Sequence, residues 1–289
     1  MKRSFKYIIL ASLIGAMATG CSNNDDEKLI PAEVTNLRAE STPGRIVLRW
    51  ETPKEGNIRY IQVNYYDPLL KKDVMKTASI YADSIEITDT RRKYGEYTFN
   101  IKSVSPTGNV SVMQEIKTLS EPAKATWVST PIVLKAEDLA TNAQESSEGA
   151  IANLVDGNNS TYFHSTWSGN VPPAPHWFSA NLNQTLNGHF KFTIVARNAS
   201  NRPSDVDLMG STDGKQWFLI RHLNKENDGL SLTSPYESET FAIEQPFSHI
   251  KFIVNATNTG TVFFSMAEFK LYSMELIDPE APDEDETTL

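Results

Sequence analysis

The chain has little cysteine and no excess of positive charge, and both shortages exclude whole classes of protein. One cysteine occurs among 289 residues, so neither an intrachain disulfide nor a cysteine-based zinc site can form. Lys and Arg total 27 against 36 Asp and Glu, a net charge of −9, which argues against a nucleic-acid partner. With 39% hydrophobic residues the composition is globular, and we expect one or two domains stabilised by packed cores.

The N-terminal segment lacks an apolar run long enough to span a bilayer. Residues 1–20 begin with Lys2, Arg3 and Lys6, continue with a short apolar run over 7–14, and end in small residues. This pattern is typical of a secretory signal peptide. A retained transmembrane helix is the weaker alternative, because such a helix needs roughly 20 apolar residues.

Cys21 stands where cleavage of this signal peptide is expected. Residues 18–21, Ala-Thr-Gly-Cys, resemble the lipobox of bacterial lipoproteins, with Ala18 in place of the usual Leu. The resemblance implies lipidation of Cys21, whereas ordinary secretion would leave a free thiol. The acidic spacer 21–30 resembles the signal that sends Bacteroidota lipoproteins to the cell surface. We therefore expect a lipid-anchored protein on the outer face of the outer membrane, with a mature net charge of −12.

Residues 31–124 show short alternating apolar segments separated by Pro and Gly, which predict antiparallel strands. The clearest segments are 45–50, 60–65, 84–87 and 97–104. Their number and spacing favour an immunoglobulin-like β-sandwich. Trp50 on an early strand and Tyr97 at the start of a late strand resemble landmarks of a fibronectin type III domain. We expect Trp50 in the core and the Tyr97 hydroxyl bonded back to the chain.

A second β-rich unit is expected over residues 132–275. Residues 121–131 have little periodicity and contain two prolines, so we place the boundary there, and residues 276–289 read as an acidic tail. The strands alternate and no long helical pattern occurs, which favours a β-jelly roll. Trp177 and Trp217 lie within strand patterns and are predicted to be core residues.

Four motifs of the second unit stand in a recognisable order. They occupy residues 153–164, 176–178, 211–217 and 266–269. Together they resemble coagulation factor 5/8 type C, or discoidin-like, domains, and among these the galactose-binding modules attached to sialidases and galactose oxidase. The resemblance implies a discoidin-like β-jelly roll. The whole chain is therefore expected to be all-β, with an immunoglobulin-like β-sandwich followed by that jelly roll.

The first of these motifs carries oxygen ligands of the kind that calcium prefers. Asp156, Asn158 and Thr161 lie on one turn, and calcium takes about six to eight hard oxygens. The family resemblance adds the backbone carbonyls of Asn153 and Ala267 and the carboxylate of Glu268. We predict one structural Ca²⁺ ion. The alternative is an Asx-rich turn closed by hydrogen bonds alone.

Aromatic and hydrogen-bonding residues on separate loops predict a sugar site, because a ring packs on sugar C–H groups while polar side chains bond the hydroxyls. By resemblance to galactose-binding relatives, the predicted contacts are His164, Trp167, Arg197, Asn198 and Phe263. Taken singly, His164 could instead be a structural residue with its hydrogen bonds satisfied, Arg197 a surface charge and Phe263 a core ring. A further acidic contact could come from Glu137, Gln144, Glu145 or Glu148, among which the sequence does not choose.

The second unit offers no opposing carboxylate pair by motif, and the chain has no phosphate-binding loop or nucleophile elbow. We therefore expect a non-catalytic surface lipoprotein. It would capture galactose-type glycans for an outer-membrane uptake system, with the first sandwich as a spacer. The alternative is an adhesion or assembly protein that binds a protein or a host surface polymer. Exposed rings at Trp167 and Phe263 would favour the sugar.

Overall fold

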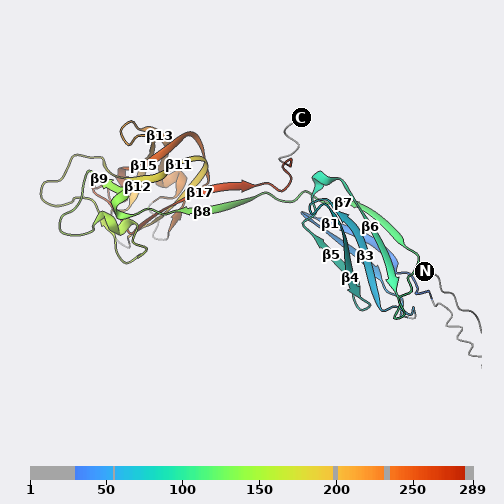
Figure 1. Ribbon diagram of the computed structural model, residues 1–289. Coiled ribbons are helices and arrows are strands. Elements are labelled where there is room, and N and C mark those ends of the chain that lie inside the picture. Colours follow the sequence, from blue (N-terminus) through green and yellow to red (C-terminus); the bar gives the residue numbers. More distant parts are fainter. Residues whose placement is uncertain (1–29, 55, 198–200, 231–234, 284–289) are drawn as a thin grey trace, which may run out of the picture. The chain divides into compact units, whose positions relative to one another are not determined.

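The computed structural model describes residues 30–54, 56–197, 201–230 and 235–283, and the chain divides into two compact units between Ala123 and Lys124 (Figure 1). Both units are built from strands, so the predicted all-β class is confirmed. No helix in the described part of the chain is long and apolar enough to cross a bilayer. Cys21 lies outside the described residues.

The first unit is a sandwich of two antiparallel sheets. One sheet has the order β1 (Thr35–Thr42), β2 (Arg45–Glu51), β5 (Ser84–Thr88). The other has the order β4 (Lys72–Ser79), β3 (Tyr60–Asp67), β6 (Glu96–Val104), β7 (Gln114–Leu119), and η1 (Arg92–Tyr94) precedes β6. Every second side chain of β2, β3 and β6 is buried, as strand geometry requires. Trp50 is in this core, as predicted.

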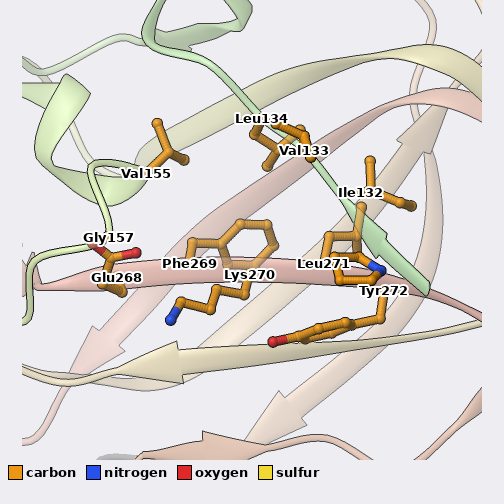
Figure 2. Close-up of a pocket in the computed structure, with 11 residues that line it drawn as sticks. Ile132, Val133, Leu134, Val155, Gly157, Glu268, Phe269, Lys270, Leu271 and Tyr272 are labelled. Atoms are coloured by element: carbon orange, nitrogen blue, oxygen red, sulfur yellow. The ribbon is translucent and has the colours of Figure 1, made fainter. Parts of the chain in front are cut away.

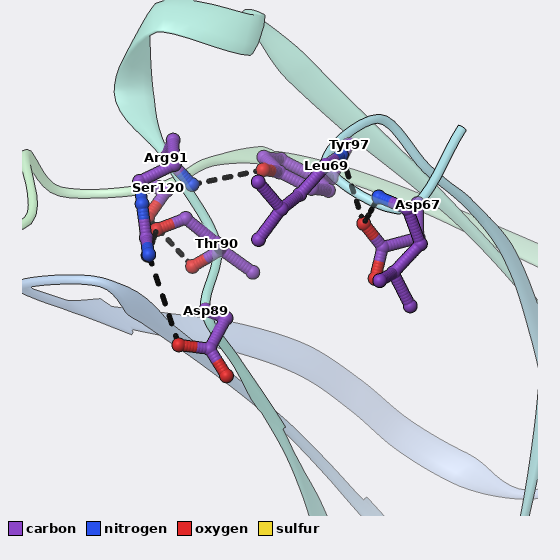
Figure 3. Close-up of polar contacts among 8 residues, drawn as sticks. Asp67, Leu69, Asp89, Thr90, Arg91, Tyr97 and Ser120 are labelled. Carbon is purple, nitrogen blue, oxygen red and sulfur yellow. Dashed lines mark hydrogen bonds and ion pairs between the residues drawn. The ribbon is translucent and has the colours of Figure 1, made fainter. Parts of the chain in front are cut away.

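Tyr97 forms the expected bond back to the chain. Its ring is buried in the core, and its hydroxyl accepts a hydrogen bond from the backbone N–H of Arg91 at 2.8 Å (Figure 3). Beside it, the hydroxyls of Thr90 and Ser120 are bonded at 2.7 Å. Burial raises the pKa of Tyr97, so the hydroxyl keeps its proton at neutral pH. These bonds fix the chain segment that enters β6.

The second unit is organised around one eight-stranded sheet with the path β13 (Phe218–Asn224), β12 (Pro203–Ser211), β15 (Phe241–Thr257), β11 (His176–Val195), β17 (Glu268–Ile277), β8 (Thr126–Ile132). β9 (Leu139–Thr141) and β14 (Tyr236–Glu237) also pair with β11. β10 (Phe163–His164) and β16 (Ser265–Met266) form a separate pair. The short helices are η2 (Ala136–Asp138), η3 (Ile151–Leu154) and α1 (Lys225–Asp228).

Phenylalanine dominates the core of this unit. Phe178, Phe192, Phe252 and Phe269 come from β11, β15 and β17 and are almost fully buried. Their ring centroids lie between 5.1 and 6.3 Å apart, within the range of favourable aromatic packing. This core holds together the strands whose connecting loops carry the candidate site.

The boundary predicted at residues 121–131 is wrong in its second half, because β8 begins at Thr126. β8 pairs with β17 along its whole length, from Thr126 with Ile277 to Ile132 with Leu271, and the two strands run side by side in Figure 1. Residues 126–131 are all exposed, so β8 has no apolar alternation to reveal it. β17 also includes Leu276 and Ile277, which were expected in the tail.

Trp177 and Trp217 are not core residues, contrary to prediction. Both are half-buried and lie against Lys251, whose Nζ is 4.5 Å from the ring centroid of Trp177 and 4.0 Å from that of Trp217. The core face of β11 is taken by Phe178, so the neighbouring Trp177 must point to the opposite face. The two rings therefore sandwich a lysine on the outer face of the sheet.

Candidate functional site

The candidate site is built on the short strands β10 and β16. Phe163 pairs with Met266 and His164 with Ser265, and the N–H of Ser165 donates to the carbonyl of Phe264 at 2.9 Å. This pairing brings together segments that are about a hundred residues apart in the sequence. As a result, the rings of His164 and Phe263 lie with centroids 5.8 Å apart, so two of the predicted sugar contacts are neighbours.

Backbone contacts fix His164 in one orientation. Its N–H donates to the carbonyl of Gly149 at 3.0 Å, and its Nδ1 lies 2.7 Å from the carbonyl oxygen of Ser165. A carbonyl only accepts, so Nδ1 carries the hydrogen and Nε2 of the neutral ring is an acceptor. Gly149 has φ +65°, and a Cβ there would lie 2.6 Å from the His164 nitrogen. The close packing against His164 therefore requires glycine at 149.

Trp167 presents an exposed ring beside His164. The indole is 46% exposed and its centroid is 6.3 Å from that of His164. Its Nε1 donates to Glu148 Oε1 at 3.0 Å, and its backbone N–H donates to Glu145 Oε2 at 3.1 Å. Two carboxylates thus hold the tryptophan, which leaves an aromatic surface open to solvent.

Arg197 joins the same cluster through Tyr162. Its guanidinium carbon lies 3.5 Å from the centroid of the Tyr162 ring, and the Tyr162 hydroxyl donates to Glu148 Oε2. Glu148 therefore connects Tyr162 to Trp167, and its pKa is lowered chiefly by the bond from Tyr162. Tyr162 lies in the 153–164 motif, but no role was predicted for it from the sequence. Asn198, the other predicted contact of this loop, lies outside the described residues.

The structure separates the four acidic-contact candidates that the sequence left open. Glu137 is exposed, 3.9 Å from Lys135, and Gln144 bonds backbone groups of the 145–151 turn. Glu145 is buried and accepts hydrogen bonds from two separate turns, including those from the backbone N–H groups of Ser147 and Ser168. Of the four, only Glu148 contacts both Tyr162 and Trp167.

Glu145 is a structural carboxylate held by many donors. Its pKa is lowered to about 2, first by the Trp167 backbone N–H and further by the N–H groups and hydroxyl of Ser147 and Ser168, against the opposing effect of burial. It also accepts from the Ser168 hydroxyl at 3.2 Å. The ionised group therefore ties the 145–147 turn to the 167–168 turn.

The predicted calcium ligands Asp156, Asn158 and Thr161 meet in one turn. Asp156 Oδ1 accepts from the Asn158 N–H at 2.8 Å, and Asp156 Oδ2 accepts from the Thr161 hydroxyl at 2.6 Å. Asn158 Oδ1 accepts from the Ser160 N–H at 3.1 Å. Gly157 has φ +76°, which a residue with a side chain rarely adopts. Hydrogen bonds close this turn, so the Asx-turn interpretation describes part of its geometry.

Glu268 lies next to this turn and is almost completely buried. Burial raises the pKa of Glu268 and its interaction with the Asp156 carboxyl raises it further, while its Oε1 has no hydrogen-bond partner among the described residues. Glu268 and Gly157 line a hollow of about 320 Å³ whose walls include Val133 and Val155. The two residues lie side by side in Figure 2. Two facing carboxyl groups with an unsatisfied oxygen can share a proton or bind a cation.

The two predicted carbonyl ligands flank these groups in the sequence. Asn153 is in η3, and its side chain donates to the carbonyl of Tyr162 at 2.8 Å. Ala267 directly precedes Glu268, and its N–H donates to the carbonyl of Val195 at 2.8 Å. Within the described ranges no group of three or more His, Cys, Asp or Glu could hold a metal. A cation here would therefore depend on amide, hydroxyl and carbonyl oxygens, which is the donor chemistry of calcium.

Comparison with known proteins agrees with this architecture. Residues 139–269 match the F5/8 type C domain family, so the second unit contains an F5/8 type C, discoidin-like domain. A sialidase of Micromonospora viridifaciens is 24% identical over 212 residues, which cover 71% of this chain and 32% of that protein. The chain thus spans about a third of the length of this curated relative.

Three solved structures illustrate the likeness. A carbohydrate-binding module of Clostridium perfringens in complex with GalNAc-β-1,3-galactose has 19% identity and a TM-score of 0.40, covering 49% of this chain and 99% of that one. The family 32 module of C. perfringens NanJ in complex with galactose has 21% identity and a TM-score of 0.39, covering 50% and 100%. A SusE-like protein has 15% identity and a TM-score of 0.41, covering 83% and 97%.

Replacing Glu145 by Gln is expected to destabilise the protein at neutral pH but not in acid. The folded pKa of about 2 lies below the ordinary 4.5, so the stabilisation by the carboxylate is complete above the ordinary value and is lost as pH falls through the folded one. Urea unfolding of both proteins at about pH 7 and in steps to about pH 2.5 measures this difference. A difference that stays constant from neutral pH to the lowest step would contradict the assignment.

Proposed function

We propose that the second unit is a non-catalytic sugar-binding domain whose site is the rim formed by His164, Trp167, Arg197 and Phe263. The observation that carries this proposal is the exposed Trp167 ring beside the fixed His164, with Arg197 tied to Trp167 through Tyr162 and Glu148. The half-buried Phe263 ring also lies next to His164, with its centroid 5.8 Å away. The exposure of Trp167 favours a sugar over adhesion through another face.

Each group has a chemical role in this proposal. Trp167 and Phe263 offer apolar faces to the C–H groups of a sugar ring, and Arg197 offers N–H donors to its hydroxyls. His164 is only 4% exposed, so it would contribute one hydrogen bond at the bottom of the sugar site, through the acceptor Nε2. The resemblance of residues 164–167 to the His-x-x-Trp of galactose-binding domains favours a galactose-type sugar.

The carboxyl groups near the rim support a binding role rather than hydrolysis. A glycosidase needs a carboxylic acid that stays protonated opposite a second carboxylate. Glu145 and Glu148 instead have lowered pKa values and are held by donors from the protein itself. Glu268 has a raised pKa, but it is buried beside the Asp156 turn and away from the rim residues Trp167 and Arg197 in the sequence. We therefore propose a protein that binds its sugar and releases it unchanged.

We also propose that Asp156, Asn158, Thr161 and Glu268, with the carbonyls of Asn153 and Ala267, hold one structural Ca²⁺ ion. Support comes from the unsatisfied, buried Glu268 Oε1 facing the Asp156 turn. When bound, the ion would neutralise both carboxylates. Because Tyr162 follows Thr161 directly and His164 comes two residues after Tyr162, a fixed turn at 156–161 also fixes the start of the proposed sugar rim.

Calcium is therefore expected to raise the thermal stability of the wild-type protein. At about a hundred times its dissociation constant, calcium would add about 2.7 kcal/mol to the free energy of unfolding. Melting of the chelator-treated protein with and without calcium measures the shift, and Glu268→Gln should remove it. Glu237→Gln, at an exposed glutamate of the same unit paired with Lys191, is the matched control that should keep it. Equal melting of the wild type with and without calcium would refute the metal site.

The sugar site predicts a specific effect of one tryptophan. Trp167→Ala should weaken binding of galactose or N-acetylgalactosamine glycans by at least about tenfold, because stacking on the ring is lost. Isothermal titration calorimetry measures this, with Trp127→Ala as the control, since Trp127 is similarly exposed (43%) but lies on β8. No binding by the wild type across a broad glycan array, or an unchanged affinity of the Trp167 variant, would overturn the proposal.

For the location we propose a lipid anchor at Cys21 that holds the protein on the outer face of the outer membrane, where it serves a glycan uptake complex. Support comes from the lipobox-like residues 18–21 and the acidic spacer that follows them. Cys21→Ala should move the protein from the membrane fraction to the soluble fraction, because the acyl chains provide the attachment. Fractionation after metabolic labelling with a fatty acid tests this. A labelled or membrane-bound variant would contradict the anchor.

A further inference from the structure

A buried hydrogen-bond chain lies directly beneath the sugar rim. Ser165, next to His164, is completely buried, and its hydroxyl oxygen accepts from the N–H of Phe264 at 2.9 Å. The same oxygen lies 3.0 Å from Nδ1 of His176, the first residue of β11, which is also completely buried. Nε2 of His176 lies 3.1 Å from the carbonyl oxygen of Pro172.

The direction of each bond follows from its acceptor. The Pro172 carbonyl can only accept, so His176 Nε2 carries the hydrogen and Nδ1 is the acceptor. The Ser165 hydroxyl therefore donates to His176 and accepts from Phe264. Every group in the chain has a partner of the right kind, and one tautomer of His176 satisfies all three bonds.

This hydrogen-bond chain links three loops, two of which the backbone pairing of β10 with β16 already joins. One loop carries His164 and Trp167, the second carries Phe263, and the third is the proline-rich stretch 171–175, where Val171 is partly exposed. The β10–β16 pair sets the register of the first two loops, whereas the third is linked to them through His176.

We propose that Ser165 and His176 are positioning residues for the sugar site. They hold the loop with His164 and Trp167 at a fixed distance from the loop with Phe263. They also position the 171–175 loop beside both. The inference rests on the proposed function for its ligand. The fixed distance between the His164 and Phe263 rings, however, does not depend on any ligand.

The test measures two quantities in parallel on the whole chain: the distance between the His164 and Phe263 rings, and the affinity for galactose. Ser165→Ala removes a single oxygen, and His176→Phe keeps a ring but removes both bonds. His176→Gln keeps a donor and an acceptor and serves as the rescue variant. Ser211→Ala is the matched control, because Ser211 is equally buried and accepts from the Gly214 N–H in a turn without predicted site residues.

Two readouts distinguish positioning from simple stability. Galactose affinity by calorimetry should fall about tenfold in Ser165→Ala and His176→Phe and stay within about threefold in His176→Gln. The nuclear Overhauser effect between the His164 and Phe263 rings, 5.8 Å apart at their centroids, should weaken in the same two variants. Ser211→Ala should lower stability in urea while both readouts stay unchanged.

The outcomes separate this inference from the proposed function. If the Ser165 and His176 variants only lose stability, with the ring-to-ring signal and the affinity unchanged, the positioning role is wrong. If the wild type binds no galactose, the proposed function fails. In that case the Overhauser signal between the His164 and Phe263 rings is decisive. Its loss in Ser165→Ala and His176→Phe, with the signal kept in His176→Gln, supports the inference, and an unchanged signal in the first two variants refutes it.

Discussion

The pairing of β10 with β16 is the constraint on which the candidate site depends. Two residue pairs, continued by the bond from Ser165 to Phe264, join a loop near the start of the second unit to a loop near its end. Each strand is too short to be stable alone, so the pair relies on the surrounding phenylalanine core. Phe163 and Phe264 pack edge to face beneath it, with centroids 5.5 Å apart. The rim is therefore anchored to the core below it.

Three glutamates near this pair illustrate how surroundings decide the role of one residue type. Glu145 is surrounded by N–H and hydroxyl donors, which lower its pKa and keep it ionised at neutral pH, where it connects two turns. Glu148 accepts from a phenol and an indole and so orients the groups of the rim. Glu268 is buried next to another carboxyl, which raises its pKa and leaves an oxygen unsatisfied. The first two hold the residues of the candidate rim, and the third is a ligand of the calcium ion that we propose.

Sequence patterns predicted the parts of the fold that local physics controls. Alternation revealed β2, β3 and β6, and the resemblance to a fibronectin type III domain predicted that the Tyr97 hydroxyl bonds back to the chain, although not that Arg91 is its partner. β8 was missed because six of its seven residues are exposed, and Trp177 was misplaced because the neighbouring Phe178 takes the core face. Within the site, the spacing of His164 and Trp167 was readable. The contacts from Tyr162 to Arg197 and from Ser165 to His176 arise only from tertiary packing.

The most direct test of this account is a map of amide chemical shifts in the isotope-labelled protein during titration with galactose. If distant loops form one rim, the largest changes should cluster at residues 162–168, at Arg197 and at Phe263, while the amides of the first sandwich stay unchanged. Changes confined to one of these segments, or centred on the outer face with Trp177 and Lys251, would contradict the claim that these loops form a single sugar site.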